Sequence, residues 1–287
     1  MYGYFSIKEG RGKLKTSLIF CVKIKKRNIM GEYMRYRKTF EVSSHDVDVN
    51  DHMKPSSLQR YMMETAMCQM RDRKPAYGEL FRKDQAFILT RVTIEIFHQI
   101  RQFTEIEVHT WNCPAKGVTF NRCFEVYCEG GLMARCHTVW GVASPSSGKL
   151  WKASEVDLSN YESEEALEMN LPTRLRFPKD LTFEPVGTKK VLYGEVDMNM
   201  HMNNTYYMDV LWNYIPDILT KEVTSICLRY HAEAPLGGEL QIEMGKLVEP
   251  LAEDEKAEDT YCFRTFVEGN LNLEAMIGVR KTESWRL

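Results

Sequence analysis

A short segment that occurs twice constrains the fold of this 287-residue chain more than any other feature. Residues 46–53 read DVDVNDHM and residues 195–202 read EVDMNMHM, with five of the eight positions identical. Each copy follows a basic strand-like segment, precedes the long helix-like segment of its half, and is followed by strand-like segments. We interpret this shared order as a duplication, in which one structural module occurs twice along the chain.

Within each half, the spacing of apolar residues predicts one helix followed by several strands. Helical spacing predicts a helix over 56–70, which Pro55 can begin, and a second over 206–215. Alternating apolar residues predict strands at 36–42, 87–97, 105–111, 119–128 and 132–142, and again at 189–194, 224–230, 240–247, 260–268 and 273–282. A helix that precedes a run of strands is typical of an α+β fold and not of alternating βαβ units.

These patterns divide the chain into four segments. Residues 1–34 are rich in Lys and Arg, and we interpret them as a basic, disordered extension or as an overlong start before Met30 or Met34. Residues 35–150 form a first domain and residues 186–287 a second. Residues 151–185 combine an acidic stretch with three prolines and little strand pattern, so we expect a linker there.

Composition excludes several classes of protein. With 44% hydrophobic and 27% charged residues, the chain can build an ordinary globular core. A formal charge of −2 does not indicate a general affinity for nucleic acid or membranes. No apolar run approaches the roughly 20 residues that span a bilayer. The eight cysteines include no C-x-x-C pair, which argues against a disulfide framework and a structural zinc site. We therefore expect the protein to reside in a reducing cytoplasm.

The second copy of the repeat carries the residues best suited to chemistry. Asp197, Asn199, His201 and Asn203 alternate with methionines, and in an extended segment this period of two would place the four polar groups on one face. Asn204 fits the N-cap of the following helix, whose free N–H groups could hold the oxygen of a polarised carbonyl. Each residue alone also fits a turn or capping role, whereas the row as a whole favours a site.

Metal binding is not predicted for either copy. Residues 46–57 open like an EF-hand loop, but Asp51 stands where that loop needs Gly and Ser57 where it needs Glu. The histidines have no zinc-like spacing.

Residues 196–207 (VDMNMHMNNTYY) resemble the D-x-N-x-H-x-N-N segment of the acyl-acyl carrier protein (acyl-ACP) thioesterases. Residues 89–96 together with 104–111 are similar to the first-half strand pair of that family, and residues 228–233 (LRYHAE) to its L-x-Y-x-x-E block. The resemblance extends from about Tyr36 to Thr282, with both halves in the family's order.

The resemblance implies an α+β fold of two tandem hotdog domains (a double hotdog), each with a long helix wrapped by an antiparallel sheet. It implies hydrolysis of fatty acyl-ACP, which releases the free fatty acid and terminates fatty-acid synthesis, with no metal or redox cofactor. The partner would be acidic acyl carrier protein, and the enzyme a monomer or homodimer without membrane insertion. Either a docking patch for that carrier or an ordinary solvated surface could account for five basic residues near the linker: Arg174, Arg176, Lys179, Lys189 and Lys190.

Carried over position by position, the family's catalytic set is Asp197, Asn199, His201 and Glu233, and the N–H groups near Asn204 and Thr205 would face the substrate carbonyl. Glu233 would act as general base on water, with Asn199 and His201 positioning it and Asp197 holding the loop or orienting its neighbours. Which group takes the proton stays open, as does a covalent route. Plant members often carry Cys after this Glu, whereas this chain has Ala234, which removes a Cys nucleophile there.

The first copy raises the question of a second site at Asp48, Asn50 and His52. Aligning the strands that follow places Gln99 opposite Glu233, and since an amide cannot act as a base, we expect the first half to shape the acyl pocket. Three alternative functions remain at this point: a thioesterase acting on coenzyme A esters, a fused-hotdog enoyl-thioester hydratase, and a non-catalytic acyl-binding protein.

Overall fold

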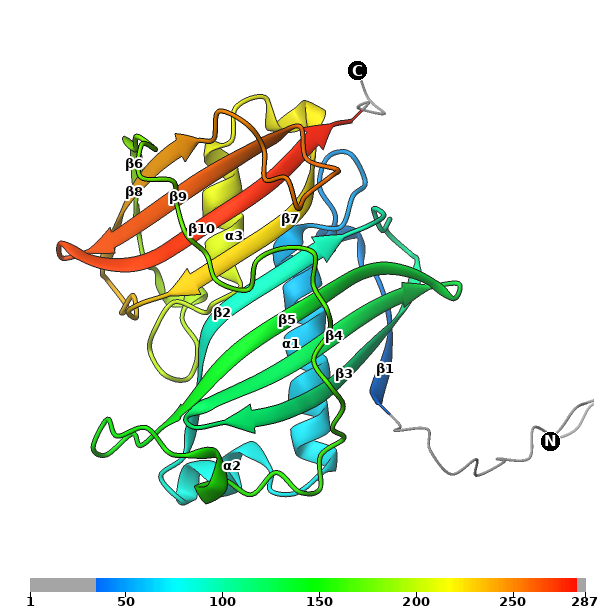
Figure 1. Ribbon diagram of the computed structural model, residues 1–287, viewed down its shortest axis with the longest axis vertical. Helices are drawn as coiled ribbons and strands as arrows, with labels where there is room; N and C mark the ends of the chain where they lie inside the picture. Colours follow the sequence, from blue (N-terminus) through cyan, green and yellow to red (C-terminus); the bar gives the residue numbers. More distant parts are fainter. Residues whose placement is uncertain (1–34, 283–287) are drawn as a thin grey trace, which may run out of the picture. The chain divides into compact units, whose positions relative to one another are not determined.

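The computed structural model describes residues 35–282, and the predicted extension at 1–34 lies outside them. Within the described residues one antiparallel sheet holds ten strands in the order β1-β3-β4-β5-β2-β7-β10-β9-β8-β6 (Figure 1). The strands are β1 (Tyr36–Glu41), β2 (Ala86–Ile96), β3 (Glu105–Lys116), β4 (Thr119–Cys128), β5 (Gly131–Ala143), β6 (Glu184–Lys190), β7 (Lys221–Tyr230), β8 (Glu239–Lys246), β9 (Asp259–Val267) and β10 (Asn270–Lys281).

This strand order reads the same from both edges once each strand is replaced by its counterpart in the other half. The two halves join where β2 pairs with β7 in antiparallel register, with Thr93 opposite Cys227. These two residues are separated in sequence by as many positions as Glu105 and Glu239, the first residues of β3 and β8. Thr93 and Cys227 therefore lie at an approximate twofold axis that relates the halves.

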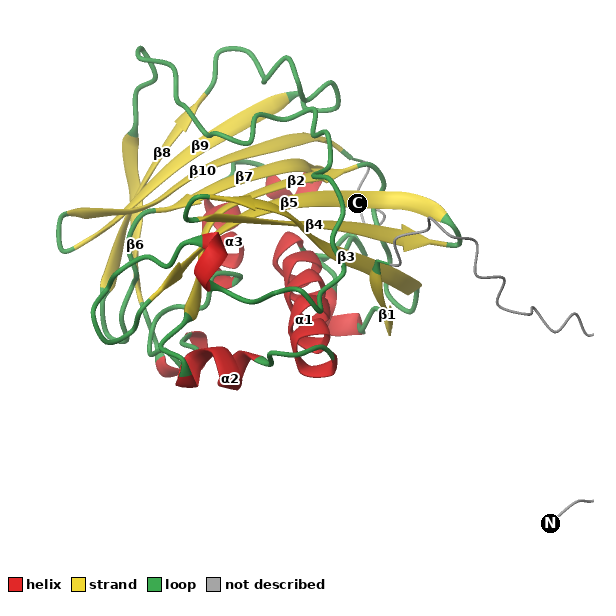
Figure 2. Ribbon diagram, turned by 60° about the horizontal axis from the view of Figure 1, so that its bottom comes forward, coloured by secondary structure: helices red, strands yellow, loops and turns green. Residues whose placement is uncertain are grey.

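The helices lie on one face of this sheet, as Figure 2 shows. They are α1 (Pro55–Asp72), α2 (Tyr77–Arg82) and α3 (Tyr206–Leu211), and the 3-10 turn Trp212–Tyr214 extends α3 to nearly the predicted length. The sequence did not predict α2. The predicted strand at 189–194 is wrong in its bounds, because the strand is β6 and Tyr193–Glu195 forms a 3-10 turn. Pro185 suits β6, which is an edge strand and needs fewer N–H donors.

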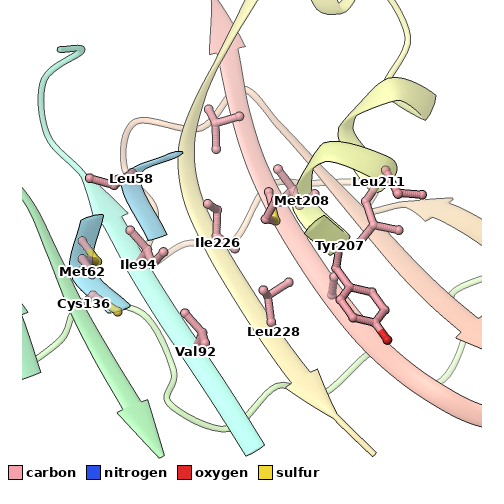
Figure 3. Close-up of a cluster of buried hydrophobic side chains, with 14 of the residues drawn as sticks. Leu58, Met62, Val92, Ile94, Cys136, Tyr207, Met208, Leu211, Ile226 and Leu228 are labelled. Carbon is pink, nitrogen blue, oxygen red and sulfur yellow. The ribbon is translucent and has the colours of Figure 1, made fainter. Parts of the chain in front are cut away.

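One hydrophobic core continues across both halves between helices and sheet. Met62 of α1, Ile94 of β2, Ile226 of β7 and Leu211 of α3 are fully buried in it (Figure 3). Burial of each such side chain stabilises the fold by about 1.5–3 kcal/mol. Because β2 and β7 share this core, the two halves are held together by packing as well as by the strand pairing.

The segment between the two halves crosses the opposite face of the sheet (Figure 1). Its apolar residues Leu171 and Leu175 pack against Cys227 and neighbouring side chains of that face. The backbone N–H of Leu171 donates to Glu95 Oε1 of β2 at 2.8 Å, which anchors the segment beside the β2–β7 pairing.

Candidate active site

The second copy of the repeat folds into a tight turn and not into an extended segment. The Asp197 carboxylate accepts the N–H of Asn199 at 2.8 Å, and the Met200 N–H donates to the Asp197 carbonyl at 3.0 Å. Met200 has a φ of 64°, which reverses the chain. The expected alternation is therefore wrong: Met198 is 80% exposed while Met202 is buried at 3%. Asp and Asn favour this turn because their short side chains bond to nearby backbone N–H groups.

Backbone hydrogen bonds hold this turn against the segment that contains Glu233. The Met202 N–H donates to the Ala234 carbonyl at 2.8 Å, and the Leu236 N–H donates to the Met200 carbonyl at 3.1 Å. As a result, His201 Nε2 lies 3.0 Å from Glu233 Oε2, with the two side chains 33% and 61% exposed. The structure thus brings together two of the predicted catalytic residues at a site that water can reach.

Asp197 and Asn199 lie on the same turn but play different parts in it. The Asp197 carboxylate accepts the Asn199 N–H and so closes the turn. Asn199 uses its backbone N–H in that bond, and its side chain is exposed at the tip of the turn.

At Asn204 and Thr205, which the sequence predicted to bind the substrate carbonyl, the start of the helix differs from the prediction. The N-cap is Thr205 and not Asn204, since α3 begins at Tyr206. The Thr205 N–H and hydroxyl both donate to Asn203 Oδ1, at 3.0 and 2.9 Å. The Asn204 carbonyl accepts the Tyr230 hydroxyl at 2.9 Å. Asn203 therefore already occupies the Thr205 N–H that was expected to face substrate.

Two buried polar residues behind Glu233, Tyr207 and Asn272, were not predicted from the sequence to belong to the site. Asn272 Nδ2 donates to the Tyr207 hydroxyl at 3.0 Å. Burial raises the pKa of Tyr207 to about 12, and the nearby Glu233 charge adds to this, while the Asn272 hydrogen bond opposes it. Asn272 interrupts an apolar strand with a residue that strands disfavour, which is the signal that could have identified it.

Tyr77 of α2, in the first half of the chain, is influenced by the charge of Asp197. Burial raises the pKa of Tyr77, and the charge of Asp197 raises it further.

The first copy of the repeat has the same backbone but a closed site. The Asn50 N–H donates to Asp48 Oδ1 at 2.8 Å, and the Met53 N–H donates to the Ile100 carbonyl at 2.7 Å. Ile100 thus takes the place of Ala234, and Gln99 that of Glu233, as the alignment predicted. Gln99 Nε2 donates to the Val223 carbonyl at 3.1 Å.

His52, the counterpart of His201, is buried and faces Glu222 of β7, with 3.8 Å between Nδ1 and Oε2. Glu222 in turn pairs with Arg280. The cavity that His52, Gln99 and Glu222 share measures about 10 Å³, which is room for a single water molecule and far too little for an acyl chain.

Comparison with known proteins identifies the family. The models of the acyl-ACP thioesterase N-terminal and C-terminal domains match residues 33–168 and 184–276. The chain belongs to the acyl-ACP thioesterase family. It is a thioester hydrolase of fatty-acid synthesis that cleaves acyl-ACP, as the sequence predicted.

Crystal structures of similar fold include an acyl-ACP thioesterase from Bacteroides thetaiotaomicron, with 20% identity and a TM-score of 0.73 over 85% of this chain and 97% of that one. A 12:0-ACP thioesterase from Umbellularia californica has 17% identity and a TM-score of 0.69 over 86% and 97% of the two chains. They confirm the predicted α+β double-hotdog fold. Among curated proteins, the comparison finds no match.

Three arginines lie together on the face of this thioesterase that the linker crosses. Arg91 of β2 is opposite Arg229 of β7, and Arg91 Nη1 donates to the Thr173 carbonyl at 3.5 Å, next to Arg174. Burial lowers the pKa of Arg91, and the charges of Arg174 and Arg229 lower it further. Lys189, one of the five basic residues near the linker, pairs with Glu195 at 2.6 Å.

Two negative findings concern the described part of this thioesterase alone. Residues 35–282 contain no group of three or more His, Cys, Asp and Glu side chains arranged to hold a metal ion. No helix in that range is both long and apolar enough to cross a membrane.

Proposed function

We propose that the enzyme cleaves the acyl-ACP thioester at the His201–Glu233 pair, with water as the nucleophile. The observation that carries this proposal is the 3.0 Å separation of His201 Nε2 and Glu233 Oε2 at an accessible edge of the second half. A carboxylate that is exposed and held beside an imidazole can take a proton from water.

In this reaction Glu233 removes a proton from water while the oxygen adds to the carbonyl carbon. The exposed Asn199 amide donates a hydrogen bond to the carbonyl oxygen as negative charge develops there. The carbon–sulfur bond then breaks, and the carrier thiolate leaves and receives the proton through His201. Asp197 acts indirectly, because its carboxylate closes the turn that carries Asn199 and His201.

The two halves divide the work in this proposal. Residues 186–287 form the catalytic domain, because only this half has a carboxylate at the position of Glu233. Residues 35–150 form the domain that shapes the acyl pocket, since Gln99 cannot act as a base there. Residues 151–185 link them.

The carrier protein would dock over Arg91, Arg174 and Arg229. Like charges placed close together are costly unless anionic groups offset them. Glu274 pairs with Arg229 at 3.6 Å, and an acidic carrier would offset the remaining positive charge of the cluster. Arg229 lies near the end of β7 and precedes Glu233 by four residues, so a carrier bound there could deliver its acyl thioester to the site. We propose that the enzyme works in the cytoplasm as a monomer or homodimer, with no nucleic-acid partner.

The test is an assay of released thiol and free fatty acid with acyl-ACP and the matching acyl-coenzyme A, over several chain lengths. We expect stoichiometric release of both products, with a higher kcat/KM for the carrier ester. A hydrated acyl chain still attached to the carrier, or binding without release of either product, would contradict the proposal.

A further inference from the structure

A buried polar triad lies behind the proposed base. It consists of Tyr207 from α3, Thr265 from β9 and Asn272 from β10, exposed by 2%, 0% and 0%. Thr265 Oγ1 donates to Asn272 Oδ1 at 2.7 Å, and Asn272 Nδ2 donates to the Tyr207 hydroxyl at 3.0 Å. Figure 3 shows the Tyr207 hydroxyl beyond the apolar side chains of the core.

Asn272 also binds the backbone immediately before Glu233. Its side-chain Nδ2 donates to the Ala232 carbonyl at 2.6 Å. The backbone carbonyl of Asn272 accepts the N–H groups of His231 and Ala232, at 2.8 and 3.2 Å. Asn272 can reach both because β10 bulges at this residue, where the register with β9 shifts between Leu271 and Leu273. One side chain and its backbone therefore fix the peptide that leads into Glu233.

The first half offers an internal comparison for this arrangement. Its fifth strand has the same register shift at Met133, whose carbonyl accepts the N–H groups of Phe97 and His98 at 2.7 and 3.2 Å. Met133 is thus the counterpart of Asn272, and Val126, which pairs just after the shift, is the counterpart of Thr265.

Leu58 follows Met53 by as many residues as Tyr207 follows Met202, so it is the counterpart of Tyr207. All three counterparts are apolar. The fold accepts an apolar set at these positions, so the fold alone does not require the polar set in the second half. Burying polar groups costs free energy that apolar side chains at the same positions would not cost. Since the fold does not require the polar triad, we look to the site for its role.

We propose that Asn272 is a positioning residue for Glu233, held in its working orientation by Thr265 and Tyr207. The triad fixes the Ala232 peptide, and this limits the range over which the Glu233 carboxylate can move relative to His201. The proposal rests on the function proposed above, in which Glu233 takes the proton from water.

The test compares Thr265→Val, Thr265→Ser and Thr138→Val in the full-length enzyme. Thr138 is the control: it is also fully buried in a strand, donates its hydroxyl to the Arg122 carbonyl at 2.9 Å and accepts the Trp140 indole N–H at 2.8 Å, so Thr138→Val also removes buried hydrogen bonds, but away from Glu233. Kinetics with acyl-ACP give kcat and KM, and hydrogen exchange of the peptide covering residues 231–235 reports on the backbone directly.

We expect Thr265→Val to lower kcat by about tenfold or more with KM within about twofold, since small displacements of a reacting group are costly. Exchange at 231–235 should become faster in the same variant. Thr265→Ser should restore both properties, and Thr138→Val should change neither. Tyr207→Phe, which keeps the ring and removes one bond of the triad, gives a second variant with the same expectation should Thr265→Val fold poorly.

Unchanged kcat in Thr265→Val and Tyr207→Phe, or exchange no faster than in Thr138→Val, would overturn the positioning role. If the wild-type enzyme released no thiol, the proposed function would fail separately. Hydrogen exchange would then decide alone whether the triad fixes this segment.

Discussion

Gln99 occupies in the first half the backbone position that Glu233 occupies in the second. In each half the backbone N–H of a methionine in the repeat donates a hydrogen bond to the carbonyl of the residue that follows Gln99 or Glu233. The pairs are Met53 with Ile100 and Met202 with Ala234. The duplication has therefore kept the backbone of the site twice, whereas only the second half has a carboxylate at the position of Glu233. His201 and His52 should therefore differ in their effect on catalysis.

Replacement of His201 by Ala should lower kcat by about 100-fold, since it removes the group that pairs with the base. The equivalent His52→Ala should leave kcat within about twofold and lower the free energy of unfolding by about 1–3 kcal/mol, because His52 is buried. Steady-state kinetics and urea denaturation of both variants check this. Equal losses of activity would mean that both copies take part in catalysis.

The arginine cluster should affect binding of the carrier protein and not the rate of thioester hydrolysis. Arg174→Glu should raise KM for acyl-ACP by about tenfold at low salt, with kcat nearly unchanged. Hydrolysis of a short acyl-pantetheine ester, which has no carrier protein, should stay the same. Lys116→Glu, an exposed charge reversal at the end of β3, is the control. A similar rise in KM for the control would point to a general charge effect.

Tyr207 should make the fold sensitive to high pH. Its pKa is about 12 in the folded state, whereas a free tyrosine has a pKa of about 10, so between these values the unfolded chain loses the proton first. The stability it contributes is complete below pH 10 and is lost as the pH rises toward 12, by about 1.4 kcal/mol per pH unit. Urea denaturation from pH 8 to 12 should therefore show a shallower fall for Tyr207→Phe than for wild type. Parallel curves would mean that Tyr207 ionises as readily in the folded enzyme.

Gly245 of β8 should resist any side chain. A Cβ there would lie 2.5 Å from the Thr182 carbonyl oxygen, which is backbone and cannot rotate away. Gly245→Ala should therefore lower the free energy of unfolding by about 1–3 kcal/mol, as overpacking does. Gly194→Ala, where a Cβ meets nothing within 4 Å, is the matched control. Equal stability of the two variants would show that the linker yields at Thr182.

Much of this fold could be predicted from the sequence, because strands buried on one face carry a period of two that survives in the residues. The bounds of β6 were missed since an edge strand that contains Pro185 and Gly187 has little such pattern. The turn at Asp197 was mistaken for an extended segment because polar residues that alternate for turn chemistry have the same period as a strand. Asn272 could not be assigned a role, since its partners Thr265 and Tyr207 meet it only after the sheet and helix have packed.

The most direct test of the account is kcat of Glu233→Gln with acyl-ACP, compared with wild type and with Glu129→Gln, an exposed Glu in the turn between β4 and β5. The variant keeps the shape and hydrogen-bonding capacity of the side chain while removing its basicity. We predict that kcat falls by about 100- to 10,000-fold in Glu233→Gln, the range typical of general acid–base catalysis, and is unchanged in Glu129→Gln. Wild-type kcat in that variant would contradict the assignment of Glu233 as the base.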